Sequence, residues 1–587
     1  MKTFFTSLFA SFIAMILFTV LIIVILVVGI GSMSKEEKTK VEPNTLLYLK
    51  MSGEIVERSE NDFFESMGLP FNDEQKQTGL WDILESIKKA GKDPKIAGIY
   101  INLQMFDCGL GFIEEIRNSL LEFKKTNKKI ICYSEFYTNK SYYLASVADS
   151  IFINPEGEIL INGLGADLLF FKGLLDKIGV KPEILRHGKY KSATEPLFLD
   201  KMSEANKEQF NAFLGSNWKH IIEGISKERG ISEEEINLIA DKLSIRSTSD
   251  AKEKKLIDRI YYKDQVIRSL NILSKQKAED APILMSVSEY MKAPKILDKD
   301  KKVAKDKIAI IYISSEMVSG KGSNNNPGSD VIAAAIRKAA NDNKVKAIVL
   351  RINSPGGASL AADIMWREVK LAKKKKPVIA SMGNVAASGG YYVACAADTI
   401  IANPTTITGS IGVFGVMVNI KKLLNEKLGI TSDHVGTNAY TDLGNPMREL
   451  STFERDFITS QVDAVYETFT QHVAEGRKMT QQKVDSLGQG RIWSGVHAYE
   501  NGLVDAFGGI QQAIEIAAKS AKLTHYRVVA YPEKQDPFSQ IFDNKKTDKL
   551  SEIKKEIGFA GSYLETMMSV MKLEGIQARL PYEFTID

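Results

Sequence analysis

Two short loops in the second half of the chain carry residue types that hydrolyse acyl bonds. Ser388 lies among small residues in Gly383–Tyr391, at an expected helix start, where a hydroxyl can be presented to a ligand. A second loop, Asn353–Gly357, ends in two glycines whose amides no side chain obstructs. Such amides stabilise the oxyanion of a tetrahedral intermediate. The loops together indicate a serine nucleophile, although Ala-Ala-Ser-Gly-Gly alone also fits a packing corner or a helix cap.

A serine nucleophile needs a general base, for which histidine is the usual residue. The chain has six histidines, and none lies between His220 and His434. Their spacing is not typical of metal ligands, so we expect neither a metal nor a cofactor. A histidine triad would need residues from distant parts of the chain to meet in space. Lysine is therefore the favoured candidate base.

The elements that position these loops are expected to form a parallel sheet. Helical patterns such as Asp330–Ala339 separate short β-branched runs at 307–313, 347–352 and 377–381. Alternating strands and helices are typical of an α/β fold, whose right-handed crossovers leave functional loops at the carboxyl ends of the strands. The glycine loop and the serine loop each follow one of these strands.

The sequence also repeats itself with an offset of 249 residues. Lys95–Leu103 resembles Lys344–Ile352, and Ala148–Pro155 resembles Ala397–Pro404. This period has the size of a whole domain, so it indicates tandem domain duplication. We expect a membrane anchor at 1–40, repeat domains at 41–295 and 296–533, and a partly helical C-terminal tail at 534–587.

The composition is that of a globular protein with more than one core: 587 residues, 44% hydrophobic and 26% charged. The net charge of +4 is small, and the run Lys373–Lys376 lies at an expected helix C-terminus, where cations complement the helix dipole. We therefore expect no nucleic-acid partner. The three cysteines give no disulfide framework.

The N-terminal segment predicts a membrane helix. No charged residue occurs from Thr3 to Ser34, and 12–30 is almost purely aliphatic. About 20 apolar residues span a bilayer, whereas a cleaved signal peptide has an apolar core of about 7 to 15 residues and a small-residue cleavage site. We expect an uncleaved anchor, and the flanking charges do not decide its orientation.

Four motifs resemble the signal peptide peptidase A (protease IV) family in its long, duplicated form. They are Lys191–Pro196, Asn353–Gly357, Ala386–Tyr391 and Thr408–Gly415, and the similarity extends from the anchor to about Asp505. The resemblance implies two tandem crotonase/Clp-protease-like domains with parallel sheets and crossover helices. It implies a Ser/Lys dyad that cleaves signal peptides, a soluble body on the periplasmic side of the inner membrane, and a ring-like homo-oligomer, expected to be a tetramer.

Matched residue by residue, the family's nucleophile falls on Ser388 and its general base on Lys191. The serine that assists the lysine falls on Ser410. For the oxyanion hole we expect the amides of Gly357 and Gly389. These five residues are the predicted catalytic site.

The repeat provides an independent check on this assignment. The counterparts of Ser388 and Gly357, 249 residues earlier, are Asn139 and Cys108, so the first copy lacks the nucleophile and the glycine loop. The second copy has no lysine at the position that corresponds to Lys191. We therefore expect one site per chain, assembled between the domains and within one chain.

A lysine acts as a base only when it is neutral. With an ordinary pKa of about 10.4, about one in a few thousand is neutral at neutral pH, and burial lowers that pKa by about 3 to 5 units. We expect Lys191 to be desolvated, to accept the Ser388 proton and to return it to the leaving amine. Without the resemblance, Lys191 would fit a surface lysine beside Glu195.

Apolar peptides, above all cleaved signal peptides left in the membrane, are the expected substrates, bound in extended form along a strand edge. The resemblance implies a preference for Leu, Val and aromatic side chains. One alternative is a crotonase-like enzyme for acyl-CoA, which uses the same paired amides but also needs an adenine-nucleotide site. The other alternative is a non-catalytic membrane scaffold in which the loops only pack.

Overall fold

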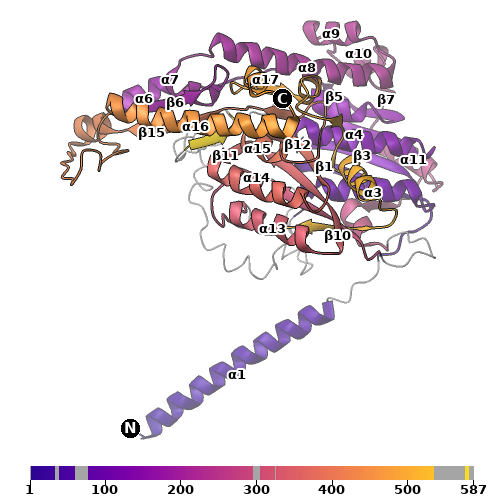
Figure 1. Cartoon of the computed structure of the whole chain (residues 1–587). Helices are drawn as coiled ribbons and strands as arrows, with labels where there is room; N and C mark the ends of the chain where they lie inside the picture. Colours follow the sequence, from indigo (N-terminus) through magenta and orange to yellow (C-terminus); the bar gives the residue numbers. More distant parts are fainter. Residues whose placement is uncertain are drawn as a thin grey trace.

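The computed structural model describes residues 2–33, 39–59, 77–294, 304–323, 326–533 and 576–580. Figure 1 shows helix α1 (Lys2–Met33) apart from the body that the other elements form. Within the described part of the chain, no helix is long and apolar enough to cross a membrane. The side chains of residues 22–38 lie outside the described residues, so the anchor remains a prediction.

The first half of the chain builds a seven-stranded sheet in which all pairings are parallel. Its order is β2-β1-β3-β4-β5-β7, with β8 beside β1. The strands are β1 (Thr45–Val56), β2 (Thr78–Gly79), β3 (Ile96–Asp107), β4 (Lys129–Tyr137), β5 (Ser150–Ile159), β7 (Arg259–Ile260) and β8 (Leu284–Ser286). The helices of this half are α3 (Leu80–Lys92), α4 (Leu110–Lys124), α5 (Asn139–Ala145), α6 (Lys172–Ile178), α7 (Glu195–Phe198), α8 (Glu204–Arg229), α9 (Glu233–Lys242), α10 (Thr248–Glu253), α11 (Lys263–Leu273) and α12 (Val287–Lys292).

The second half builds an eight-stranded sheet, parallel except where β14 meets β16. Its order is β16-β14-β12-β10-β9-β18, with β13 beside β12 and β17 beside β13. The strands are β9 (Lys307–Ile313), β10 (Val345–Ser354), β12 (Val378–Ala387), β13 (Thr399–Ala402), β14 (Ile407–Gly409), β16 (Ile492–Ser494), β17 (Ala506–Phe507) and β18 (Arg527–Tyr531). The helices are α13 (Ser329–Asn341), α14 (Ser359–Lys373), α15 (Gly389–Ala394), α16 (Thr452–Arg477), α17 (Gln481–Leu487), α18 (Gly495–Glu500) and α19 (Ile510–Ser520).

The central strands are apolar because both of their faces are buried. In β10, Ile348 and Leu350 belong to an apolar cluster of the second half, whereas Val349 points the other way. Val349 lies in a cluster that also contains Ile99 and Ile101 of β3. The two halves therefore share this apolar cluster.

The duplication predicted from the sequence is confirmed at the level of the elements. Strands β10, β12 and β13 each begin 249 residues after β3, β4 and β5, and α14 begins and ends 249 residues after α4. The expected boundary at 295/296 lies outside the described residues, so the domain limits remain predictions. The helical part expected in the tail also lies outside them, and the described piece, β19 (Ile576–Arg579), is a strand.

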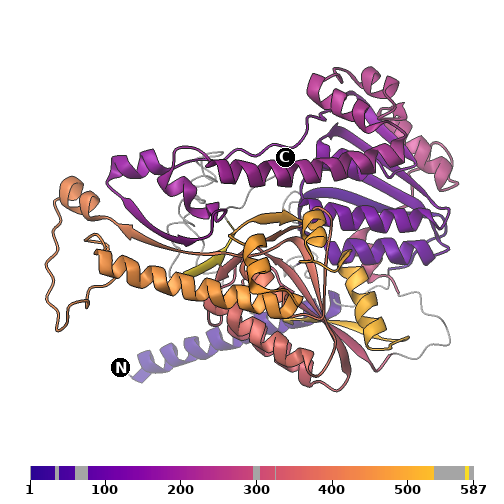
Figure 2. The same ribbon diagram turned by 45° about the horizontal axis from the view of Figure 1, so that its top comes forward.

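A third sheet, which we did not predict, joins the two halves. Its order is β11-β19-β15-β6, and all its pairings are antiparallel. Strand β6 (Lys181–His187) comes from the first half, and β11 (Gly356–Ala358) and β15 (Val413–Asn419) come from the second. Seven residues of β6 pair with seven of β15, which brings the segment after β6 beside the segment before β15 (Figures 1 and 2).

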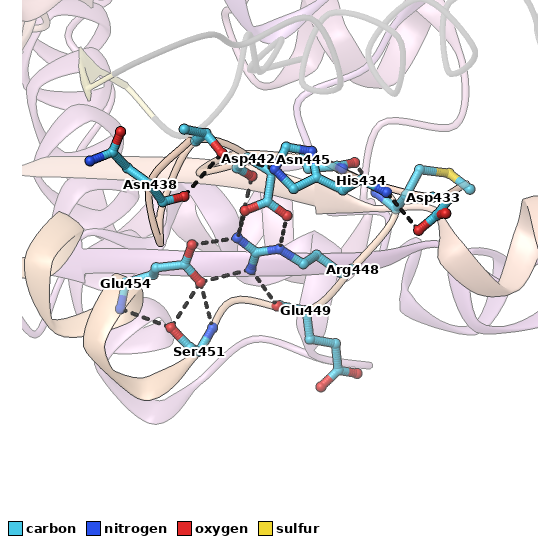
Figure 3. A network of polar contacts seen from close by, with 11 residues as sticks. Asp433, His434, Asn438, Asp442, Asn445, Arg448, Glu449, Ser451 and Glu454 are labelled. Atoms are coloured by element: carbon cyan, nitrogen blue, oxygen red, sulfur yellow. Dashed lines mark hydrogen bonds and ion pairs between the residues drawn. The ribbon is translucent and has the colours of Figure 1, made fainter. Parts of the chain in front are cut away.

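The long connection from β15 to α16 is fastened to the start of that helix. Arg448 contacts the carboxylates of Asp442 and Glu454 (Figure 3). Ser451, the N-cap of α16, donates its backbone N–H and its hydroxyl to Glu454 at 2.9 and 2.8 Å. The hydrogen bonds from Arg448 lower the pKa of Glu454 to about 2, so this carboxylate stays charged and holds the connection in place.

Candidate active site

Ser388 occupies the sharp turn between β12 and α15. Its backbone φ is 54° and its ψ is −114°, which is a strained conformation for a residue with a side chain. Its N–H donates to the Gly409 carbonyl at 2.8 Å, and its carbonyl accepts the Tyr392 N–H at 2.8 Å. Hydrogen bonds to β14 and within α15 thus hold the turn in this conformation.

Lys191 reaches this hydroxyl from the first half of the chain. It follows β6 and is completely buried. Its Nζ lies 2.9 Å from Ser388 Oγ, 3.0 Å from Ser410 Oγ and 3.3 Å from the Ser410 carbonyl oxygen. The expected burial of Lys191 is confirmed, and the reading as a surface lysine is wrong.

The surroundings of Lys191 favour its neutral form. Burial holds the pKa of its amine well below the ordinary lysine value, and no acidic group opposes that shift. Glu195, its neighbour in sequence, accepts hydrogen bonds from Ser203 and Asn206 instead. Phe414 adds an apolar wall, with its ring centre 5.9 Å from the amine.

The three contacts of the Lys191 amine match the capacity of a neutral amine. Such a group has one lone pair and two N–H donors, and Ser410 offers two acceptor oxygens, its hydroxyl and its carbonyl. When the amine is neutral, its lone pair remains for the Ser388 hydroxyl, which also lies 3.4 Å from the Gly412 carbonyl oxygen. The backbone of Ser410 is fixed by its N–H, which donates to the Arg491 carbonyl at 2.7 Å.

The two glycines predicted for the oxyanion hole, Gly357 and Gly389, belong to two loops that lie against each other. Gly356 and Gly357 have φ angles of 100° and 154°, and a Cβ on Gly357 would lie 2.2 Å from the Met317 carbonyl oxygen. A Cβ on Gly356 would lie 2.7 Å from the Gly389 amide nitrogen. Only glycine therefore fits this close approach of the glycine loop to the start of α15.

The structure thus brings Ser388, Lys191 and Ser410 together and sets Gly356, the neighbour of Gly357, against Gly389. The corresponding place in the first copy is different. Asn139 lies at the start of α5, and its side-chain amide donates to Asn162 and to the Gly163 carbonyl at 2.8 and 2.9 Å. Among the described residues, no group of His, Cys, Asp or Glu could hold a metal ion.

A buried ion cluster, which the sequence did not reveal, connects the strands that carry the site with the first half of the chain. Arg351 on β10 is fully buried, and its guanidinium contacts Glu57 at 2.8 Å and Glu115 at 2.7 Å, both from the first half. It also donates to Ser381 Oγ on β12 at 3.0 Å. Because β10 leads to Gly357 and β12 leads to the nucleophile turn, this cluster ties both loops to the first half.

The chain matches the model of peptidase family S49 twice, at residues 122–277 and 370–524. Among its relatives are the chloroplastic serine protease SPPA of Arabidopsis thaliana, 33% identical over 92% of this chain and 78% of that protein. Protease 4 of Haemophilus influenzae is 33% identical over 84% of this chain and 82% of its own length. Protease 4 of Salmonella typhi is 33% identical over 90% of this chain and 86% of its own length.

Proposed function

The chain belongs to peptidase family S49 and is a serine peptidase, and we propose that it cleaves peptides with Ser388 as nucleophile and Lys191 as general base. Membership of this family rejects the alternatives of an acyl-CoA enzyme and a silent scaffold. The observation that carries the dyad is the 2.9 Å approach of the buried Lys191 amine to Ser388 Oγ.

The reaction follows from this geometry. Ser388 Oγ attacks the substrate carbonyl carbon while its proton passes to the lone pair of Lys191, which becomes an ammonium ion. That ion returns the proton to the leaving amine as the peptide C–N bond breaks and an acyl-enzyme forms. Water then attacks the ester carbonyl carbon while Lys191 takes a proton from it. The ester C–O bond breaks, the ammonium ion returns the proton to Ser388 Oγ, and the acid is released. Ser410 orients the amine throughout through its two oxygens.

The oxyanion formed in each step would be held by the amides of Gly357 and Gly389. The proximity of the two glycine loops supports this assignment, because donors on one loop alone would form only half of a hole. No side chain can be added at Gly357 without a clash with the Met317 backbone, so this position requires glycine.

Peptide hydrolysis by three variants tests the dyad. We expect Ser388→Ala and Lys191→Ala each to lower kcat/KM by about 10³-fold or more, because the dyad acts as a unit. Lys189→Ala is the matched control, since Lys189 lies two residues away and is exposed. Full activity in either dyad variant, or equal loss in the control, would reject the assignment.

We propose apolar peptides as substrates, including cleaved signal peptides in the membrane. The long aliphatic stretch at 12–30 supports this, because a chain anchored by it would meet lipid-released peptides. Peptide series with Leu, Val, Phe, Asp or Lys at the cleavage site test the preference. We expect higher kcat/KM for the apolar residues, and a preference for Asp or Lys would contradict the proposal.

The same segment supports the proposal of a single-pass anchor in the inner membrane, with the body on the periplasmic side. Alkaline extraction should leave the full chain with the membrane, whereas a chain that starts at residue 40 should be released. Protease added outside spheroplasts should then digest the body. Protection of the body would reverse the proposed orientation.

We also propose a homotetrameric ring, which the repeat supports. With an offset of 249 residues, the counterpart of β15 in the first copy is 164–170. With an offset of 250 residues, the counterpart of β6 in the second copy is 431–437. Gly179 and Gly429, which have φ angles of 80° and 69°, mark the same turn in the two copies. Neither counterpart belongs to a strand in the described structure. Pairing of 164–170 with 431–437 of a neighbouring chain would repeat the β6–β15 contact around a closed ring.

Val435 supports this contact, because its side chain is 94% exposed in the single chain. Val435→Asp should convert the tetramer into smaller species in size-exclusion chromatography with light scattering. Ile272→Asp is the control, since Ile272 is 79% exposed but lies outside both segments. A tetramer that survives Val435→Asp, or dissociates equally in the control, would contradict the proposal.

A further inference from the structure

The C-terminal strand β19 lies between two strands of the predicted active site. It pairs antiparallel with β11 on one side and with β15 on the other. Strand β11 carries Gly356 and Gly357, and β15 follows Ser410 after a short turn. The strand is yellow in Figures 1 and 2, and it runs beside β11.

The register places Ala578 at the predicted oxyanion hole. Ala578 lies opposite Gly357, and its carbonyl oxygen would be 2.0 Å from a Cβ on Gly356 and 3.1 Å from a Cβ on Gly389. A peptide carbonyl of the tail therefore sits against the two loops that are predicted to hold a substrate carbonyl. An extended substrate that adds a strand to β11 would use the same edge.

Polar contacts fix the tail on both sides of Ala578. The Leu580 N–H donates to the Pro355 carbonyl at 2.7 Å, and Ser359 Oγ donates to the Ile576 carbonyl at 3.0 Å. Arg579 forms an ion pair with Glu316 at 3.1 Å.

Apolar burial adds to this docking. Ala578 and Leu580 are 0% and 3% exposed. Ala578 packs in the cluster of Leu185 and Val413, which belong to β6 and β15. Its backbone, one ion pair and two buried apolar side chains therefore contribute to holding the tail.

We propose that the segment Ile576–Leu580 is an internal competitor that occupies the substrate-binding edge of β11 and must leave before a peptide is cleaved. This inference rests on the proposed function, because it assigns the edge of β11 to peptide substrates. Because a tethered segment competes intramolecularly with an added peptide, its release should lower the apparent KM, and we expect a change of about threefold or more. The value of kcat should not change, because the tail supplies no reacting atom.

Two full-length variants test the competition. Leu580→Asp places a charge in an apolar site, and Arg579→Glu sets two like charges together at Glu316. Both should lower KM about threefold or more at constant kcat, and Glu316→Arg combined with Arg579→Glu should restore the original KM. Arg527→Glu makes the same charge change at an exposed position of β18 and should change neither parameter. An unchanged or raised KM in both tail variants would overturn the proposal.

A binding measurement separates this inference from the proposed function. In chains that carry Ser388→Ala, a fluorescent apolar peptide should bind more tightly after Leu580→Asp, and a capped peptide with the sequence of 574–582 should displace it, unlike a scrambled peptide. If no variant hydrolyses peptides but this binding result holds, the proposed function fails and the inference stands. Equal binding with and without Leu580→Asp would overturn the inference alone. If the wild type loses residues 579–587 by cleavage and Ser388→Ala keeps them, the tail is a substrate of the site and not a competitor, which would also overturn the inference.

Discussion

The Nζ atom of Lys191 lies 2.9 Å from the Oγ atom of Ser388, although 197 positions separate the two residues in the chain. One belongs to each copy of the duplicated unit, and the antiparallel pairing of β6 with β15 brings them together. The duplicated chain thus places one residue of the proposed catalytic pair in each half.

Burial of Lys191 should make stability depend on pH. Folding lowers the pKa of this amine, so the unfolded chain binds its proton more readily and the folded state is penalised below the ordinary lysine pKa. The difference in unfolding free energy between wild type and Lys191→Met should therefore grow in favour of wild type from neutral pH to about pH 10.5. Urea denaturation at several pH values measures it. Lys189→Met should show no such trend, and a flat difference for Lys191→Met would mean that its amine stays charged when folded.

Removal of the Ser410 hydroxyl should weaken the base without abolishing it. Ser410→Ala takes one of two acceptors from the Lys191 amine and leaves the carbonyl contact at 3.3 Å. We expect kcat to fall about 10- to 100-fold, with little change in KM, because the lost contact orients the base and does not bind substrate. Steady-state kinetics check this, and a change confined to KM would place Ser410 in substrate binding.

Loss of the buried guanidinium should destabilise the fold. Arg351→Met leaves Glu57 and Glu115 buried without their partner, so the free energy of unfolding should fall by about 3 to 5 kcal/mol. Lys346→Met is the control on the same strand, since Lys346 is exposed and its ion-pair partner, Asp306, is 3.7 Å away. This substitution should lower the free energy of unfolding by less than about 0.5 kcal/mol. Urea denaturation midpoints measure both. Similar midpoints for the two variants would contradict the role of the cluster.

Glu57 should give the opposite pH dependence to Lys191. Burial raises the pKa of its carboxyl from 4.5 to about 7, so the folded chain binds this proton more readily than the unfolded chain. Its contribution to stability is therefore complete below pH 4.5 and is lost as the pH rises to about 7. Glu57→Gln should flatten the stability profile across this window in thermal unfolding. An unchanged slope would show that another group titrates there.

The sequence predicted what depends on local pattern. The apolar run 307–313 is β9 as expected, and the expected helix at 330–339 lies inside α13. The offset of 249 residues, found in two short segments, holds for whole strands and helices because each copy repeats the same layers. The chemical requirement for a neutral base also predicted the burial of Lys191, which no local pattern indicates.

Other features depend on contacts between distant residues, so no local pattern could reveal them. Arg351 lies 294 positions from Glu57, and on sequence alone a charged residue in a strand is as easily placed at the surface. The sheet that joins the halves pairs β6 with a strand that has no counterpart strand in the first copy. The segment Ile576–Arg579 is too short for its alternation to be distinguished from a loop.

The central claim is that a neutral Lys191 amine activates Ser388, and the pH dependence of Ser388 acylation tests it most directly. A peptidyl acylating probe should label Ser388 with a rate that rises with pH and reaches its plateau well below pH 10.5, because burial lowers the pKa of Lys191. Lys191→Ala should lower the plateau by about 10³-fold or more. Half-maximal acylation at the ordinary lysine pKa, or an unchanged rate in Lys191→Ala, would contradict the account.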